Sequence, residues 1–223
     1  MANWTPVSIA NLALASMGST PIQSFDDATP AGSNCKMFYP LVMRGLFAEY
    51  PWAFARDTRP LNSLNMTELP DGALPSGWRY AYALPADMIG PPEKFLANRR
   101  LPDRPETHFE VQNQIVYSDQ SALWVVAMFY VDEASWPDYF VTAAVACLTA
   151  EIYPFITGNG PRLPNLQQTA WGLPSDNRRG GKLGVAMRAD ARNNPSRILS
   201  RNPLIDVRGG GTQDVWSNGP GGA

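Results

Sequence analysis

The chain has 223 residues, enough for one sizeable hydrophobic core or for one domain carrying a smaller appended one. Apolar residues make up 44%, charged residues only 17% and aromatic residues 11%, which leaves a weakly charged surface of the kind that meets other proteins. Residues 1–159 carry nine lysines and arginines against sixteen acidic residues, whereas residues 160–223 carry nine against four, and the pI of about 5.4 argues against a DNA-binding domain.

Two helices are predicted at the start of the chain. Residues 5–17 have a threonine cap, a proline in the first turn, an apolar stripe at helical spacing and a glycine after their end. Residues 29–50 show a second apolar stripe. Because Pro40 lies inside this second stretch, we expect a kink or a break near residues 37–40.

The middle of the chain changes from helical to alternating hydrophobicity. Residues 56–77 are rich in proline, asparagine, serine and glycine and are predicted to form a long loop. A small antiparallel β-sheet is predicted over about residues 78–131. It includes a hairpin around residues 112–114 and a last strand within residues 123–131 that is apolar enough to be covered on both faces.

The C-terminal third returns to helical patterns. Residues 135–153 form the clearest helix, with a serine cap, and residues 163–171 and 182–193 form two shorter ones. Residues 194–223 are predicted to be an extended, basic, glycine-rich tail. The predicted fold class is therefore α+β: mainly a helical bundle with a small antiparallel β-sheet inserted between the helices, in one domain of residues 1–193, plus the extended tail.

No membrane span, secretory signal or disulfide framework is expected. The longest apolar run, residues 122–131, is far shorter than the roughly 20 residues of a spanning helix. The N-terminus lacks a basic stretch followed by an apolar one. Cys35 and Cys147 lie in apolar helical patterns and are predicted to be buried free thiols, as expected of a protein made in a reducing cytoplasm.

Catalytic chemistry has little support in the sequence. His108 is the only histidine, so no His–His or His–Cys metal pair exists, and nucleophile elbows, phosphate-binding loops and dinucleotide fingerprints are missing. The adjacent carboxylates Asp26-Asp27 and Asp132-Glu133 lie in connections, where capping and turn roles are usual. We therefore expect no enzyme, no metal site and no cofactor, with Asp27 as a capping or turn residue.

Arginine outnumbers lysine fifteen to three, and arginine suits bidentate, partly desolvated contacts with acidic groups. Two of the arginines share a face of the predicted 182–193 helix, where Asp190 dilutes their charge. Docking on an acidic protein partner is the favoured interpretation, with a solvated, disordered tail as the alternative. The candidate docking residues are Arg188, Arg192, Arg197, Arg201 and Arg208.

Short motifs along the chain, in their order and spacing, resemble one protein family. They include Ser24-Phe25-Asp26-Asp27, Tyr50-Pro51-Trp52-Ala53-Phe54-Ala55 and Trp136-Pro137-Asp138-Tyr139-Phe140, with further matches at residues 11–18, 38–40, 80–87, 129–131 and 183–191. Together they touch about two-thirds of the chain. In these features the sequence resembles the tail tubular protein A family, the head-to-tail adaptors (head completion proteins) of short-tailed bacteriophages.

The resemblance implies a structural virion protein at the head-to-tail interface, made in the host bacterial cytoplasm. Family members form a dodecameric ring beneath the portal protein, with the C-terminal segment on the portal and the tail nozzle, of the tail tubular protein B type, at the other end. Tail fibres are a further candidate partner. The genome passes through the channel without sequence-specific binding, and no membrane is involved.

Two alternatives and one departure accompany this resemblance. The alternatives are another phage tail component, associated with the nozzle or fibres, and a virion-associated glycan hydrolase. The departure concerns the last helix, which is usually long in the family. Here Gly172, Pro174, Gly180 and Gly181 interrupt it, so residues 163–193 form either one helix or two pieces.

Overall fold

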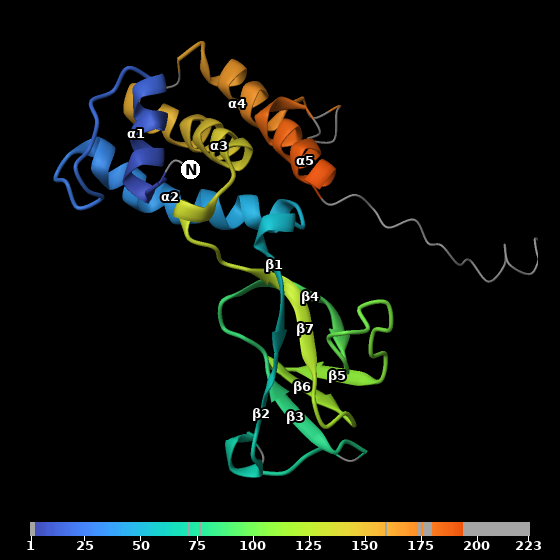
Figure 1. The fold of residues 1–223 in the computed structure, drawn as a ribbon. Helices are drawn as coiled ribbons and strands as arrows, with labels where there is room; N and C mark the ends of the chain where they lie inside the picture. Colours follow the sequence, from blue (N-terminus) through green and yellow to red (C-terminus); the bar gives the residue numbers. More distant parts are fainter. Residues whose placement is uncertain are drawn as a thin grey trace, which may run out of the picture. The chain divides into compact units, whose positions relative to one another are not determined.

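The computed structural model describes residues 3–70, 72–75, 77–158, 160–173, 175 and 180–193. In these residues, the α-helices from the two ends of the sequence, within residues 6–49 and 138–193, gather together and form the helical part (Figure 1). The strands between them, within residues 56–129, form two small antiparallel sheets, which we call the sheet part. The predicted α+β class is therefore confirmed. The predicted tail, residues 194–223, lies outside the described residues.

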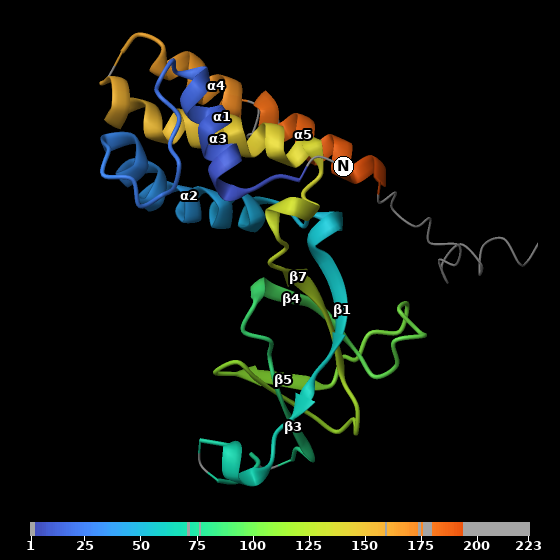
Figure 2. The same ribbon diagram turned by 60° about the vertical axis from the view of Figure 1, so that its left-hand side comes forward.

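One helix lies at the centre of the helical part. α3 (Asp138–Thr157) contacts α1 (Pro6–Ser16), α2 (Pro30–Glu49), α4 (Leu163–Trp171) and α5 (Gly181–Asn193), and Figure 2 shows these helices around it. Buried alanines along α3 let its neighbours approach closely. The helical core also contains an aromatic cluster that joins the end of α2 to the start of α3, with rings from Phe47, Trp52, Phe54, Trp136 and Phe140.

Both long helices continue through a proline. α2 runs unbroken past Pro40, so the predicted break is wrong, and α3 runs past Pro154 and four residues beyond its predicted end. A proline inside a helix removes one hydrogen bond to the carbonyl four residues earlier. Pro40 lies on the exposed side of α2, where water can satisfy the freed carbonyl of Lys36, so the helix can continue.

The start of α3 also differs from the prediction. The expected serine cap, Ser135, belongs instead to a short 3₁₀ turn, η3 (Glu133–Ser135), and α3 begins after Pro137 without a side-chain cap. Proline keeps the preceding residue, Trp136, in an extended conformation, so the helix cannot begin earlier. Asp138 occupies the first turn, as predicted, where its charge complements the helix dipole.

Residues 163–193 form two helices rather than one. Gly172 follows α4 with φ of +82° and Gly181 opens α5 with φ of +61°, conformations that favour glycine. A side chain at Gly172 would approach the backbone of Gly180 to 2.7 Å. The glycines that interrupt the sequence pattern therefore let α5 fold back against α4.

The first sheet has the strand order β1-β7-β4, and all its pairs are antiparallel. β1 (Arg56–Pro60) pairs with β7 (Trp124–Phe129), which pairs in turn with β4 (Met88–Leu96). The central strand β7 is largely buried, as its apolar sequence predicted. Register shifts between Ile89 and Lys94 mark an irregularity in β4.

The second sheet has the order β2-β3-β6-β5, again antiparallel, and is formed by β2 (Asn62–Ser63), β3 (Tyr80–Ala83), β6 (Ile115–Ser118) and β5 (Phe109–Gln112). The hairpin between β5 and β6 is confirmed. Its two turn residues, Asn113 and Gln114, have φ of 47° and 66°, as a tight two-residue hairpin turn requires.

Two predictions about the sheet region are wrong. The described residues form two sheets instead of one, and the sheet region begins at β1 rather than at residue 78. The predicted loop at residues 56–77 contains β1, β2 and the 3₁₀ turn η2 (Met66–Glu68). β1 was missed because its sequence, Arg-Asp-Thr-Arg-Pro, has no apolar alternation, and it is an edge strand placed by pairing with the distant β7.

α3 is long and apolar enough to span a membrane by length and composition, with a mean hydropathy of 1.6 over an 18-residue window. The expectation of no membrane span considered only uninterrupted apolar runs, and α3 is a candidate that it did not consider. Other helices surround α3, and 56% of that window is buried inside the protein. This is the pattern of the core helix of a bundle, so it is weak evidence for a membrane span.

Candidate interaction surfaces

α5 carries the two candidate docking arginines that the structure describes. Arg188 and Arg192 are both exposed and lie one helical turn apart, so they share a face as predicted. A shallow groove of about 330 Å³ runs along this helix and is lined by Gly184, Met187, Arg188 and Ala191. The other three candidates, Arg197, Arg201 and Arg208, lie outside the described residues.

Asp190, between these arginines in sequence, is buried and does not lie on their exposed face. Its side chain is 1% exposed and accepts hydrogen bonds from the backbone N–H of Ala53 at 2.8 Å and from the Tyr139 hydroxyl at 2.7 Å. Burial, together with the bond to Asp190, raises the pKa of Tyr139 well above its usual range, so the hydroxyl remains a donor. Asp190 therefore fastens α5 to η1 (Ala53–Ala55) and α3.

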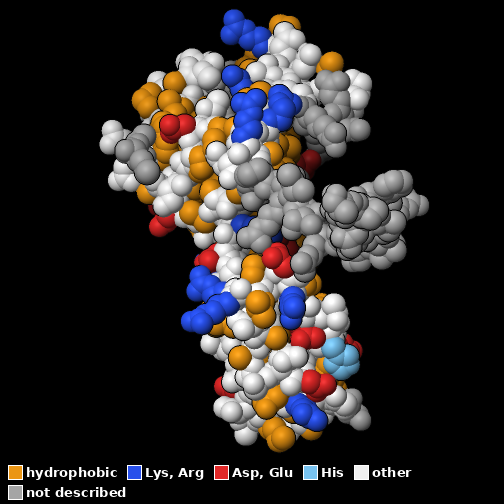
Figure 3. All heavy atoms as spheres, turned by 45° about the vertical axis from the view of Figure 1, so that its right-hand side comes forward, with side chains coloured by type: hydrophobic (Ala, Val, Ile, Leu, Met, Phe, Trp, Pro, Cys, Tyr) orange, Lys and Arg blue, Asp and Glu red, His pale blue; other side chains and the backbone are white. Residues whose placement is uncertain are grey.

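An apolar surface covers part of α2 and the end of α3. More generally, hydrophobic side chains reach the surface of the protein among charged ones, as the face drawn in Figure 3 shows. Met37 and Leu41, one turn apart on α2, are 66% and 67% exposed, and Phe155 of α3 is 58% exposed. Phe155 contacts the ring of Phe38 at 4.7 Å between centroids, which joins the two helices into one patch. Large exposed apolar side chains that gather in this way are typical of protein interfaces. We call this set the α2 patch.

A cavity of about 810 Å³ opens between the helical part and the sheet part. Its walls come from α2, from residues 86–89 at the start of β4, and from residues 130 and 133 before α3. Phe25, Met43 and Met88 supply apolar surface, while Lys36 and Arg44 supply cations. The cavity therefore combines apolar walls with charged groups, as binding pockets do.

Glu133 is the unusual group in this cavity. Its side chain is only 5% exposed, and its Oε1 accepts hydrogen bonds from the hydroxyls of Tyr130 at 2.6 Å and Tyr39 at 3.2 Å. Burial, strengthened by the nearby carboxylate, raises the pKa of both tyrosines well above their usual range, so they remain donors. None of the ion pairs within the described chain involves Glu133.

The sequence interpretation missed this cluster. Asp132-Glu133 was expected to be a pair of capping or solvated turn residues, but Glu133 is buried. Tyr39 lies 94 residues away in sequence, inside the second helix that was predicted from the apolar stripe of residues 29–50. No local pattern joins these residues, because only the packing of α2 against the segment before α3 brings them together.

The second pair of adjacent carboxylates behaves as expected of turn residues. Asp27 accepts hydrogen bonds from the backbone N–H of Gln23 at 2.6 Å and from the Ser24 hydroxyl at 3.3 Å, and the backbone bond lowers its pKa. Asp26 is 81% exposed in its side chain and pairs with Lys36 at 2.7 Å. The predicted turn role of Asp27 is confirmed.

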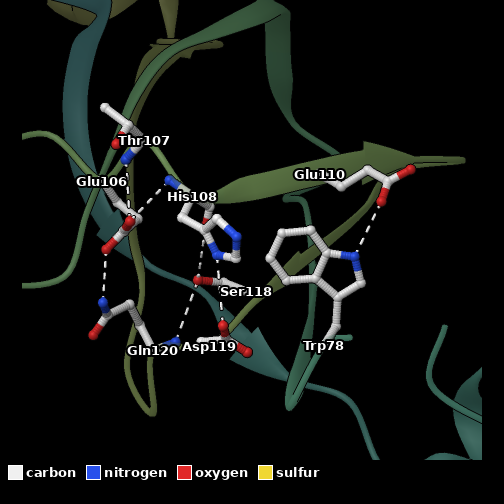
Figure 4. Close-up of polar contacts among 8 residues, drawn as sticks. All are labelled: Trp78, Glu106, Thr107, His108, Glu110, Ser118, Asp119 and Gln120. Atoms are coloured by element: carbon white, nitrogen blue, oxygen red, sulfur yellow. Dashed lines mark hydrogen bonds and ion pairs between the residues drawn. The ribbon is translucent and has the colours of Figure 1, made fainter. Parts of the chain in front are cut away.

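His108 lies at the surface of the sheet part, in the group of polar residues drawn in Figure 4. Its Nδ1 is 3.5 Å from a carboxylate oxygen of Asp119, and its ring lies 4.7 Å from that of Trp78. Trp78 in turn donates its indole N–H to Glu110 at 3.0 Å. These contacts tie the β5–β6 hairpin to the residues around it.

Ser118, His108 and Asp119 superficially suggest a catalytic triad, but the geometry does not support one. The Ser118 hydroxyl donates to the backbone carbonyl of His108 at 3.5 Å rather than to its imidazole, and the serine is fully buried (Figure 4). A triad requires the base to take the proton of an accessible nucleophile. This cluster is therefore structural.

The two cysteines are buried, and the acidic residues are further possible metal ligands. Cys35 and Cys147 are buried and free, as predicted. Burial, with Glu151 and Glu49 nearby, raises the pKa of Cys147 to about 12. Within the described residues, no group of three or more histidine, cysteine, aspartate or glutamate side chains is placed to hold a metal ion.

Comparison with protein-family models and with curated proteins gives no match for this chain.

Proposed function

We propose that the protein is a ring-forming head-to-tail adaptor of a short-tailed bacteriophage. In this role it docks on the portal protein, extends the channel through which the genome passes and provides the attachment site for the tail nozzle. The order of short motifs along the chain supports the proposal. A structural role also accords with Asp190, Ser118 and Asp27, whose polar side chains brace the fold.

The observation that carries an assembly role is the α2 patch. Met37, Leu41 and Phe155 expose most of their apolar side chains to solvent in a single chain, which costs solvation free energy unless another protein covers them. Beside them, Gly45 has open space around the position of a Cβ atom, so nothing in the chain itself requires a glycine there. A second polypeptide can therefore approach α2 closely.

The experiment that tests the proposal is co-sedimentation of the purified protein with the portal ring of its phage. We expect the full-length chain to sediment with the portal and to form rings that are visible by electron microscopy. A truncation that ends at Asn193 separates the roles of the basic C-terminal segment and the helical part. Binding by the full-length chain alone assigns docking to residues 194–223, and equal binding assigns it to the helical part.

Failure of both chains to bind the portal would contradict the adaptor role. The same preparations should then be tested for binding to the tail nozzle and for hydrolysis of bacterial cell-wall glycan, which represent the two alternatives. An adaptor should hydrolyse no glycan, and substitution of the exposed Asp26 should leave its portal binding unchanged.

A further inference from the structure

The cavity beside Glu133 has the chemistry of a guanidinium site. A buried carboxylate without a cation is costly, and the two tyrosine hydroxyls both donate to Oε1, so Oε2 retains acceptor capacity. The rings of Tyr39 and Tyr130 border the same cavity, and Phe25 contacts Tyr39 at 5.3 Å between centroids. Arginine is the side chain that combines a planar cation for a carboxylate with a face that stacks on aromatic rings.

The charged residues at the rim of the cavity also restrict which segment can bind there. Lys36 is paired with Asp26, but Arg44 adds a further positive charge on the same side of α2. Asp87 also lines the cavity but is paired with Arg59, so Arg44 is the rim charge that a segment carrying an acidic residue close to its arginine would complement. The apolar walls at Met43 and Met88 also favour an aliphatic side chain in the same segment.

The loop at residues 98–105, between β4 and β5, carries this combination. Its sequence is Asn-Arg-Arg-Leu-Pro-Asp-Arg-Pro, and Leu101 is an exposed apolar residue between Arg100 and Asp103. Lys94 donates to the carbonyl of Pro102 at 2.7 Å, and Asn98 accepts from the N–H of Arg100 at 2.9 Å. These bonds pre-organise the loop, which lowers the entropy lost on binding.

The loop cannot fill the cavity of its own chain. Met88 at the first end of β4 lines the cavity, and Leu96 at the other end adjoins the loop. These two ends pair with Phe129 and Trp124, which lie five residues apart on β7, so they are separated by roughly 17 Å at about 3.3 Å per residue. A backbone hydrogen bond of 2.8 Å from Glu106 to Phe95 closes the base of the loop at the far end. The occupant must therefore come from another molecule.

We propose that the cavity receives the 98–105 loop of a second copy of this chain, with Arg100 directed at Glu133 and Leu101 against the apolar walls. The loop and the cavity are different surfaces of the same chain. Each copy can therefore insert its loop into one neighbour and receive the loop of another. Such a heterologous contact generates a closed ring or an open filament. The inference rests on the proposed function, because it assigns the contact between neighbouring subunits of the ring.

Disulfide cross-linking tests this contact in the full-length chain. Pro40→Cys, on the exposed rim of the cavity, is combined with Leu101→Cys, and the protein is oxidised mildly on the portal ring. We expect a ladder of covalent dimers, trimers and higher species on a non-reducing gel, whereas each single variant gives no ladder. The matched control pairs Pro40→Cys with Met66→Cys, a residue of η2 that is more exposed than Leu101, and should give no ladder.

A second measurement does not depend on introduced thiols. Arg100→Glu should lower the yield of rings at least about tenfold, as expected for a central interface arginine. Glu133→Gln, which preserves shape, should lower it similarly while the circular dichroism spectrum stays unchanged. Rings that form without a ladder and tolerate Arg100→Glu would overturn this contact and leave the adaptor role intact. Absence of any self-association, with or without the portal, would overturn both.

Discussion

At the scale of single residues, buried polar groups hold the elements of this protein together. Asp190 is the best example, because its two carboxylate oxygens accept from different elements: Oδ2 from the backbone of Ala53 and Oδ1 from the side chain of Tyr139. A buried acceptor that loses its donor, or a donor that loses its acceptor, keeps the cost of desolvation. Conservative substitutions of such residues should therefore lower the free energy of unfolding more than conservative substitutions at the surface.

Asp190→Asn should destabilise the protein by about 1–3 kcal/mol, because an amide offers one acceptor oxygen where the carboxylate uses two. Urea unfolding followed by tryptophan fluorescence measures the change. The matched control is Asp26→Asn, which alters an exposed ion pair and should change the midpoint little. Equal effects of the two substitutions would contradict the anchoring role of Asp190.

The two thiols give a second prediction at this scale. Burial raises the pKa of Cys35 and raises that of Cys147 to about 12, and only the thiolate is reactive. In the native protein at pH 8, neither thiol should react with a chromogenic disulfide reagent within minutes, and two should react per chain after unfolding in urea. Rapid reaction of one thiol in the native state would show that the helical part opens around it.

At the scale of elements, α2 contains two glycines with opposite surroundings. A Cβ atom at Gly32 would lie 2.6 Å from the backbone oxygen of Asp27, whereas a Cβ atom at Gly45 would meet nothing within 4 Å. Gly32 therefore permits the close approach of the Asp27 turn to the start of the helix. Gly45, in contrast, makes the helix less stable than an alanine would, although the chain has room for a Cβ atom there.

Gly32→Ala and Gly45→Ala form a matched pair, with the same chemical change in the same helix. Gly32→Ala should destabilise the protein by about 1–3 kcal/mol, because backbone must move to admit the methyl group. Gly45→Ala should stabilise it by about 0.5–1 kcal/mol, the usual gain of alanine over glycine inside a helix. Thermal unfolding measures both changes, and a shift in the same direction would contradict the assigned environments.

The elements also show what the sequence can predict. The five helices of the described chain were placed because their apolar stripes, glycines and prolines are local signals. β1 was missed because its five residues are polar and its partner strand lies more than 60 residues later. The cluster of Glu133 with Tyr39 was missed for the same reason, since each residue has an ordinary role in its own segment and packing alone joins them.

At the scale of the whole molecule, the charge asymmetry should govern docking. The acidic residues are concentrated in residues 1–159, while α5 presents Arg188 and Arg192 on one exposed face. Complementary charge speeds association and selects the partner. The portal is the partner that the proposed function assigns to these arginines.

Arg188→Glu combined with Arg192→Glu should weaken portal binding at least about tenfold. The matched control, Arg162→Glu with Lys182→Glu, makes the same change in net charge at other exposed positions of the basic C-terminal third. Sedimentation at several salt concentrations distinguishes the two double variants. Equal loss in both would mean that net charge, rather than this face of α5, drives docking.

The pairing of β1 with β7 has a consequence for folding and for change over evolution. The chain leaves the helical part at Arg56 and returns at Met128, and these two residues are directly paired. The sheet part is therefore an insertion in the helical part, and the two ends of this insertion are in contact. The entropy of closing a loop grows only with the logarithm of its length, at about 0.6 kcal/mol for each doubling. The sheet part can therefore gain or lose residues, and with them new binding surfaces, at little cost to the stability of the bundle.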